Sequence, residues 1–542
     1  MGLKNDEESL LLRELTRIPN RTYLWVYLTL DFIESNIDIN KAGISEITSC
    51  LPVSVNDAYE KILSRSRDSA KTRKLLQIVV AAERPLTLDE MNVALSVKSS
   101  HSSYDDLDLR PAERFRITLR DLCGLFVVVV DSKIYLLHQT AREFLVKNKQ
   151  TKDLVTLQTQ RWHGCLTWED SDRMLAEICI WHLLFREFEV KPLSSETKTE
   201  DYTARHVFLD YSATFWATHL FESDIDLHDI LDSLQTLCNA RSGRCKTWLR
   251  IYWEWAYEEA PSRFTSLLVA SYFGFDALVK VLLRTPKMNL RSKHDEFGGH
   301  GALFWAAAHG NENIVKLLLR GPVMSLGRKI RLPLRRGVCV DARHTSRQTP
   351  LIIAASEGQE AVVKLLIGKG ANLELKDTRG LTALSWAAIR GEEEIAKLLI
   401  VGGADLETRD IFEQTPLLHA AEMKHKGILK LLLEKGAHTE SKDDDDQTAL
   451  IWTARKGQAG AMMLLLDYGA DIEWRDRFGK SALSWAAQRG QKDVALLLIE
   501  RGADAARKDG RGFTAINWAS AGGHAKLAEL LREKASTRRK VG

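Results

Sequence analysis

Residues 382–410 read TALSWAAIRGEEEIAKLLIVGGADLETRD, and a variant of this stretch returns every 33 residues. Each copy opens with Thr or Ser, continues through a run rich in Leu and Ala, and in most copies closes near a Gly-Ala step after a second apolar run. A fixed period of this length is the signature of a stacked repeat. The six opening residues are Thr349, Thr382, Thr415, Thr448, Ser481 and Thr514.

The chemistry of each copy predicts a pair of helices. A Thr or Ser ahead of an apolar run is a helix N-cap, because its hydroxyl accepts a backbone N–H that has no partner within the helix. Glycines such as Gly391 and Gly403 suit the left-handed backbone that ends a helix. Since no single copy can bury its own apolar face, we expect stability to come from stacking between neighbours.

These motifs resemble the ankyrin repeat. The resemblance implies a C-terminal helical solenoid, and two looser copies, TSLLVASYFG at Thr265 and GALFWAAAHG at Gly301, bring the expected number to about eight over residues 261–536. An insertion at 322–347 separates the copies at Gly301 and Thr349 and carries seven Lys or Arg against one Asp. We interpret it as a mobile loop, with a nuclear localisation signal or a site for an acidic partner as alternatives.

The N-terminal half predicts a mostly helical regulatory region. Residues 67–150 give the order of a winged-helix-like domain, in which Thr87 caps a helix at 88–97, two strands lie around Asp131-Ser132, and Thr140 caps a final helix. Residues 1–66 form a helical segment in which we expect Asn56 to cap a helix. In the same segment we expect a buried helix face that includes Leu24, Val26, Tyr27, Leu30 and Ile33. Residues 151–260 form a Trp-rich helical connector whose aromatic residues we expect in its core.

A second resemblance covers roughly residues 20–260. The sequences LPVSVNDAYEKIL, AAERPLTLDEMNVAL and YLLHQTAREFL resemble the region that follows the nucleotide-binding core in fungal NACHT–ankyrin proteins, with residues 1–66 as the end of a NACHT module. Those proteins are signal-transducing NTPases similar in logic to innate immune receptors. The resemblance implies that His138 is the remnant of a residue that contacts bound ADP in a full-length protein of this kind. The alternative, which we favour, is a His packed at a strand end.

The phosphate-binding loop that such an NTPase needs is missing from this sequence. GPVMSLGRK at Gly321 has the glycine spacing, but Arg328 stands where the motif requires Lys. We therefore expect the chain not to hydrolyse nucleotide by itself, and we predict a protein without enzymatic activity or cofactor.

Composition excludes several other classes. The net charge of +3 is too small to argue for nucleic acid or an acidic membrane. The winged-helix segment that would read DNA carries Asp89 and Glu90 and no basic residue. Seven scattered cysteines without a CxxC pair indicate a reducing compartment and no structural metal site. With no signal peptide, we expect a cytoplasmic protein, or a nuclear one if the basic insertion is a targeting signal.

We predict that the array binds a partner protein through its concave helix face and its hairpin tips. Aromatic and Arg side chains at such positions are typical of interaction hot spots. The recurring Trp at positions 305, 386, 452, 485 and 518 we interpret as packing between repeats, and Asp443–Asp446 as an acidic tip. The alternative function is the regulatory half of a nucleotide-controlled switch in defence or heterokaryon incompatibility. The predicted contact residues are Arg379, Ile389, Arg390, Phe412, Met423, Arg455, Lys456, Arg477, Phe478, Arg489, Arg511 and Phe513.

Overall fold

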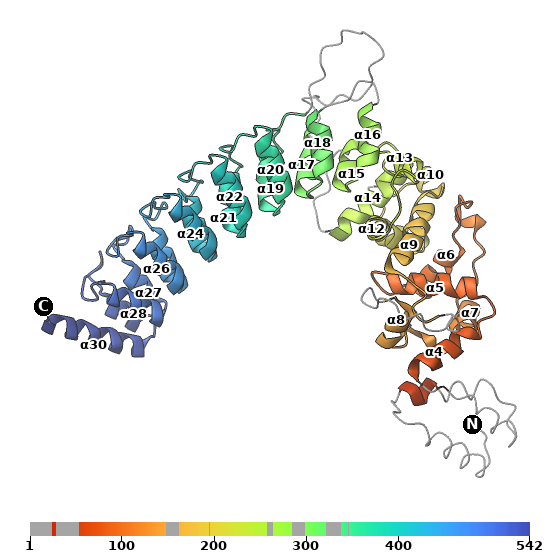
Figure 1. Cartoon of the computed structure of the whole chain (residues 1–542), viewed down its shortest axis with the longest axis horizontal. Helices are drawn as coiled ribbons and strands as arrows, with labels where there is room; N and C mark the ends of the chain where they lie inside the picture. Colours follow the sequence, from red (N-terminus) through yellow and green to blue (C-terminus); the bar gives the residue numbers. More distant parts are fainter. Residues whose placement is uncertain are drawn as a thin grey trace, which may run out of the picture. The chain divides into compact units, whose positions relative to one another are not determined.

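The computed structural model describes residues 24–28, 52, 54–147, 162–194, 196–256, 264–284, 299–320, 338–344 and 346–541. The chain divides into two compact units, Met1–Ser262 and Arg263–Gly542, which are considered separately below. The predicted fold class is confirmed, because the described part of both units is built of helices with one two-stranded hairpin (Figure 1). Most of the basic insertion and the GPVMSLGRK segment lie outside the described residues.

The first unit begins with the winged-helix order that the sequence predicts. The Thr87 hydroxyl accepts from Glu90 N while the Glu90 side chain accepts from Thr87 N, which forms a capping box. Asp131 and Ser132 both have positive φ, at 48° and 62°, as a tight hairpin turn requires. The elements are α4 (Val55–Ser64), α5 (Ser69–Ala81), α6 (Leu88–Ser96), η1 (Tyr104–Asp106), α7 (Ala112–Cys123), η2 (Gly124–Phe126), β1 (Val127–Val130), antiparallel β2 (Lys133–Leu136) and α8 (Gln139–Leu145).

Two caps in this domain differ from the prediction. Ser54, and not Asn56, caps α4, because the helix begins two residues earlier than predicted and the Ser54 hydroxyl accepts from Asp57 N at 3.1 Å. His138, and not Thr140, caps α8, since its ring Nδ1 accepts from Thr140 N at 3.2 Å. The Thr140 hydroxyl instead contacts the Tyr59 hydroxyl at 2.9 Å.

The sequence predicts the wrong buried face for the helix over residues 24–28. Over residues 24–28 the buried side chains are Trp25 and Leu28, whereas Tyr27 is exposed. The indole of Trp25 donates to the carbonyl of Pro52 at 3.0 Å, which turns this side of the helix inward. Leu30 and Ile33 lie outside the described residues.

The connector confirms the prediction that its aromatic residues are mainly core. Trp216, Trp248 and Trp253 are fully buried, while Trp168 and Trp255 are exposed. Two buried hydrogen-bond chains cross it, one of which joins Tyr104 to His182. The helices are α9 (Trp168–Leu183), α10 (Glu187–Val190), α11 (Thr199–Arg205), α12 (Leu209–Glu222), α13 (Leu231–Leu237) and α14 (Gly243–Ala256).

The described residues of the second unit form eight successive helix pairs, as predicted. The first helix of each pair packs on the first helix of its neighbours, so successive pairs stand side by side along the array (Figure 1). The pairs are α15 (Ser266–Tyr272) with α16 (Asp276–Arg284), α17 (Gly299–Ala308) with α18 (Glu312–Arg320), α19 (Pro350–Ser356) with α20 (Glu360–Gly368), α21 (Ala383–Arg390) with α22 (Glu393–Val401), α23 (Pro416–Met423) with α24 (Lys426–Glu434), α25 (Ala449–Lys456) with α26 (Ala459–Asp467), α27 (Ala482–Gln488) with α28 (Lys492–Glu500), and α29 (Ala515–Ala521) with α30 (Ala525–Val541).

The six predicted opening residues all occupy N-cap positions, but they do not all make the expected bond. The hydroxyls of Thr349, Ser481 and Thr514, like that of Thr382, accept from a backbone N–H of the first turn. Thr415 and Thr448 make no such bond. The cap distances elsewhere are 3.2 to 3.4 Å, already long for a hydrogen bond, so a slight change of geometry is enough to lose it.

Candidate functional site

The last five hairpin tips of the array are each built around one buried aspartate. Asp476 is only 4% exposed, and its Oδ1 accepts from Phe478 N at 3.0 Å and from Lys480 N at 2.8 Å. Its Oδ2 accepts from the indole Nε1 of Trp485 at 2.7 Å. We call this arrangement the Asp–Trp tie, because one carboxylate holds the tip and fastens it to the first helix of the same repeat. Ties of the same form join Asp377 to Trp386, Asp443 to Trp452 and Asp509 to Trp518.

One repeat replaces the indole by an imidazole. Asp410 Oδ1 accepts from the backbone N–H groups of Phe412 and Gln414, and its Oδ2 lies 3.2 Å from Nε2 of His419. Burial by itself would raise the pKa of Asp410, but the contact with His419 and the two backbone donors hold that pKa below its usual value. The carboxylate therefore stays charged and the tip keeps the same geometry as its neighbours.

The tips also bond to one another. Ile411 N donates to the Arg379 carbonyl at 3.1 Å, Asp444 N to the Phe412 carbonyl at 3.2 Å, and Arg477 N to the Asp445 carbonyl at 3.0 Å. Gly479 is required at this contact, because a Cβ there would lie 2.5 Å from the backbone N of the next tip. Hydrogen bonds thus join the tips from Arg379 to Arg477 into one row, and the last tip packs closely against that row at Gly479.

The three predicted tip phenylalanines are held out from this row. Phe412, Phe478 and Phe513 are 49%, 41% and 41% exposed, although the backbone N–H of each is fixed by its aspartate. Met423, at the end of a first helix, is also exposed. Ile389 is half-buried. The row therefore presents apolar side chains on a rigid backbone.

The predicted basic residues fall into two groups. Arg390 lies 3.7 Å from Glu357, Arg477 lies 2.7 Å from Asp445, and Lys456 lies 3.7 Å from Glu422, so these three have acidic partners within the array. The others lie over or beside tryptophans, or are exposed without an ion pair among the described residues. This second group consists of Arg379, Arg455, Arg489 and Arg511.

Sequence reasoning missed Lys480 and the aspartates of the ties. Lys480 is buried, with its ammonium 4.2 Å from the ring centre of Trp485 and 3.5 Å from that of Trp518. The signal was present in the pattern, since the equivalent positions in earlier repeats hold Leu381 and Gln447. The aspartates recur at the same period of 33 as the caps, from Asp377 to Asp509.

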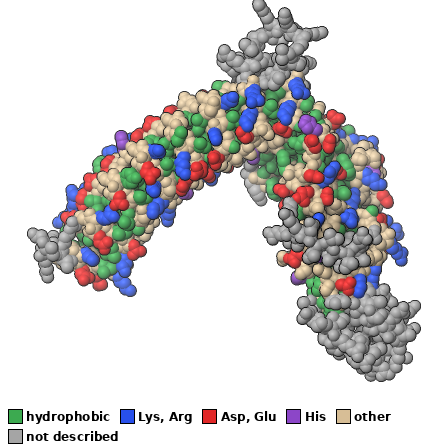
Figure 2. Space-filling view, viewed as in Figure 1, with side chains coloured by type: hydrophobic (Ala, Val, Ile, Leu, Met, Phe, Trp, Pro, Cys, Tyr) green, Lys and Arg blue, Asp and Glu red, His purple; other side chains and the backbone are tan. Residues whose placement is uncertain are grey.

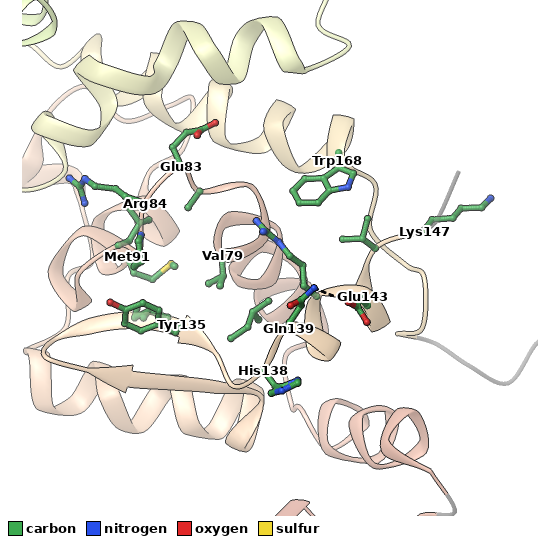
Figure 3. Close-up of a pocket in the computed structure, with 17 residues that line it drawn as sticks. Val79, Glu83, Arg84, Met91, Tyr135, His138, Gln139, Glu143, Lys147 and Trp168 are labelled. Carbon is green, nitrogen blue, oxygen red and sulfur yellow. Dashed lines mark hydrogen bonds between the residues drawn. The ribbon is translucent and has the colours of Figure 1, made fainter. Parts of the chain in front are cut away.

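His138 lies in the first unit, at the rim of a pocket of about 900 Å³ that is lined by α5 and the segment after it, α6, β2, α8 and the start of α9. Figure 3 shows its ring directed away from Trp168, which lies on the opposite side of the pocket. Arg142 stacks over Trp168 with its guanidinium 4.7 Å from the ring centre, and Gln139 donates to Glu143 at 3.1 Å. His138 also borders a second pocket of about 810 Å³, together with Tyr27 and Phe144 among others.

Comparison with known families decides the class of the array. A model described as ankyrin repeats in three copies matches the overlapping stretches 267–377, 328–410, 351–443, 417–509 and 469–540, which together cover half of the chain. The chain is an ankyrin-repeat protein. A second model, described as the GPI inositol-deacylase winged helix domain, matches residues 44–156 of this ankyrin-repeat protein.

Among curated proteins, the ankyrin-repeat protein is similar to the vegetative incompatibility protein HET-E-1 of Podospora anserina. The two are 26% identical over 136 residues, which is 24% of this chain and 9% of the relative. Together with the winged helix and the repeats, this similarity confirms the resemblance to fungal NACHT–ankyrin proteins. The aligned segment is a small part of HET-E-1, so this similarity does not show that the chain has the activity of the whole relative.

Two further observations concern the described part of this ankyrin-repeat protein. Its His, Cys, Asp and Glu side chains form no group of three or more that could hold a metal ion. Within the same residues, every helix is too short or too polar to cross a membrane. Ankyrin repeats serve typically as binding modules, which agrees with the prediction of a protein-binding surface.

Proposed function

We propose that this ankyrin-repeat protein is a non-enzymatic scaffold that binds a partner protein through its hairpin tips and the face formed by its first helices. The observation that carries the proposal is the combination of exposure and rigidity at Phe412, Phe478 and Phe513. Each ring leaves about half its surface in water while a buried aspartate fixes its backbone. A preorganised apolar surface loses little conformational entropy on binding, so more of the contact energy appears as affinity.

The basic residues beside the rings fit the same role. The Arg477 guanidinium lies 5.6 Å from the ring centre of Phe478, and Arg511 is exposed two residues before Phe513. Aromatic and Arg side chains carry most of the free energy in protein interfaces because they bury large areas. Burying what remains exposed of one Phe ring contributes about 1 kcal/mol, so three rings make a substantial anchor.

The proposal predicts the effect of removing the three rings together. A tip variant with Phe412→Ala, Phe478→Ala and Phe513→Ala should lose at least tenfold in affinity for the partner, because about 1 kcal/mol per ring is withdrawn. Its melting temperature should change little, since the rings are half exposed and the aspartates that hold the tips remain. The measurement is capture from a native extract with quantitative mass spectrometry, followed by titration with the captured protein.

A matched control removes exposed apolar side chains from the second helices. Val401→Ala with Tyr468→Ala changes exposed groups at the ends of α22 and α26. The proposal requires a protein that the wild type and this control both capture and the tip variant does not. Equal capture by all three would refute the assignment of the surface.

We propose the cytoplasm as the place of action, with the nucleus as the alternative through the basic insertion. The proposed scaffold uses no cofactor and no metal.

A second candidate function is the regulatory half of a nucleotide-controlled switch in a defence or incompatibility pathway. It is favoured by the winged-helix match and by the similarity to a vegetative incompatibility protein. In this candidate His138, exposed between two pockets, would sense the nucleotide. Calorimetric titration with ADP separates the two functions: heat that His138→Ala abolishes supports the switch, and its absence favours the scaffold.

A further inference from the structure

Cations and tryptophans alternate along the last three repeats. The guanidinium of Arg455 lies 4.5 Å from the ring centre of Trp452 and 5.3 Å from that of Trp485. The ammonium of Lys480 follows, between Trp485 and Trp518. We call Trp452, Arg455, Trp485, Lys480 and Trp518 the cation–Trp strip. Each of its two cations therefore bridges tryptophans from successive repeats.

Among the described residues, the cations of the strip are bonded to neutral amides and not to carboxylates. Arg455 donates to Gln447 Oε1 at 3.2 Å, and Lys480 donates to Gln488 Oε1 at 2.8 Å. Both amides sit in the frame of the repeat, one before the cap and one at the end of the first helix. The arrangement holds each cation in place and leaves its positive charge uncompensated by a direct ion pair.

Two more cations lie close by. Arg489 and Arg511 are exposed, and their charges act on Lys480, whose pKa is lowered first of all by burial. The carboxylates of Asp476 and Asp509 act in the opposite direction, and a third carboxylate, that of Asp443, is bonded to Trp452. Four cations, Arg455, Lys480, Arg489 and Arg511, stand against these three carboxylates, so a small excess of positive charge remains around the tryptophans at this end of the array.

We propose that the cation–Trp strip, with Arg489 and Arg511, binds an acidic peptide segment of the partner protein. This inference deepens the proposed scaffold function and rests on it. Carboxylates of the segment would pair with Arg455, Arg489 and Arg511, while apolar side chains next to them contact Phe478 and Phe513. Water screens ion pairs less beside a fixed apolar surface, and complementary charge favours association with an acidic segment over other partners.

A peptide fits this surface better than a nucleic acid. The basic cluster is short, because the nearby Lys456 and Arg477 are paired with Glu422 and Asp445, and the exposed carboxylate of Asp444 would repel a continuing chain of phosphates. On the face of the array drawn in Figure 2, basic side chains are interspersed with acidic ones rather than gathered in one long stripe. A short anionic segment meets the cations without meeting these carboxylates.

The test uses the full chain and an unbiased probe. Twelve-residue peptides are selected on the wild type from a random phage-displayed library, then labelled with fluorescein and titrated by anisotropy. We expect the selected sequences to be enriched in Asp and Glu. A strip variant, Arg455→Gln with Arg489→Gln and Arg511→Gln, should bind them at least tenfold more weakly. Raising the salt concentration should weaken wild-type binding as well.

The control makes the same change in net charge elsewhere. Lys364→Gln, Lys397→Gln and Lys430→Gln alter exposed cations on α20, α22 and α24, and should leave binding within twofold of the wild type. A comparable loss in this control would overturn the inference, since binding would then follow net charge alone. Circular dichroism melting curves of both variants verify that the fold is kept.

The remaining outcomes distinguish this inference from the function on which it rests. Peptides without acidic enrichment that bind the strip variant normally but fail with the tip variant would overturn the inference and leave the scaffold function standing. Peptides that bind the strip variant and the tip variant as tightly as the wild type would overturn both the inference and the scaffold function. Tighter binding of a twelve-residue oligothymidylate than of any selected peptide would overturn the inference in favour of nucleic acid.

Discussion

Asp476→Ala is expected to destabilise the array by about 3 kcal/mol, because it leaves three donors, the Trp485 indole and the N–H groups of Phe478 and Lys480, without their acceptor. Each buried donor without a partner costs about 1–3 kcal/mol, and water entering at the tip relieves part of that. Urea denaturation gives the free energy of unfolding. Hydrogen exchange over α25, α27 and α29 shows whether the loss is centred on this repeat.

Two companion substitutions make this prediction sharp. Asp476→Asn keeps one carbonyl oxygen, so the loss should be intermediate. Asp493→Ala removes an exposed carboxylate from the first turn of α28 and should change stability by no more than about 0.5 kcal/mol. If Asp476→Ala were as mild as Asp493→Ala, the tie would not hold the tip.

The N-terminal unit is expected to lose stability as the pH falls from 7 to 5. Burial lowers the pKa of His182 to about 3, and the ring bonds the hydroxyls of Tyr104 and Ser212. The unfolded chain takes up a proton on this side chain below about pH 6.5, while the folded protein does not until about pH 3. Stability therefore falls as the pH falls through this window, by about 2 kcal/mol between pH 7 and pH 5 from His182 alone.

Hydrogen exchange over α9 and α12 at several pH values measures this dependence within the full chain. His182→Gln should flatten the slope whatever its effect on stability at pH 7. His228→Gln, at an exposed position, should leave the slope as in the wild type. A slope that His182→Gln does not change would contradict the assignment.

The sequence predicts the array well because its physics is local and periodic. One threonine cap, one Ala-Ala step and two glycines suffice to define a helix pair, and the repetition removes the ambiguity of any single copy. The helix over residues 24–28 is not repeated elsewhere in the chain. Over residues 24–28 a shift of one position exchanges Tyr27 for Trp25 and Leu28 on the buried side, and a single copy cannot fix that phase.

The Asp–Trp ties are contacts that the pattern of the sequence could not predict. Asp443 appears in the sequence as the first of four consecutive aspartates, and we interpreted all four as one acidic tip. In the structure Asp443 is buried and holds its own hairpin, whereas Asp445 and Asp446 pair with Arg477 and Lys442. The periodicity of the aspartates was visible, but their two-sided bonding depends on where the indole of the next helix lies.

The predicted cap residues of α4 and α8 are wrong for a related reason. His138 and Thr140 can each accept a first-turn N–H, and only the start of α8 at Gln139 decides between them. The same holds for Ser54 and Asn56 before α4. Lys480 was missed because a lysine before a cap is read as solvent-exposed, and only the adjacent Trp485 and Trp518 explain its burial.

Photocrosslinking from single positions tests the central claim, that a partner protein binds the tip row, most directly. A photoreactive phenylalanine analogue replaces Phe478 in one protein and Tyr468 in another; the two aromatic side chains are 41% and 44% exposed. We expect a covalent adduct with one partner protein from position 478 and little or none from position 468. Equal adducts from both positions, or an adduct from position 468 alone, would contradict it.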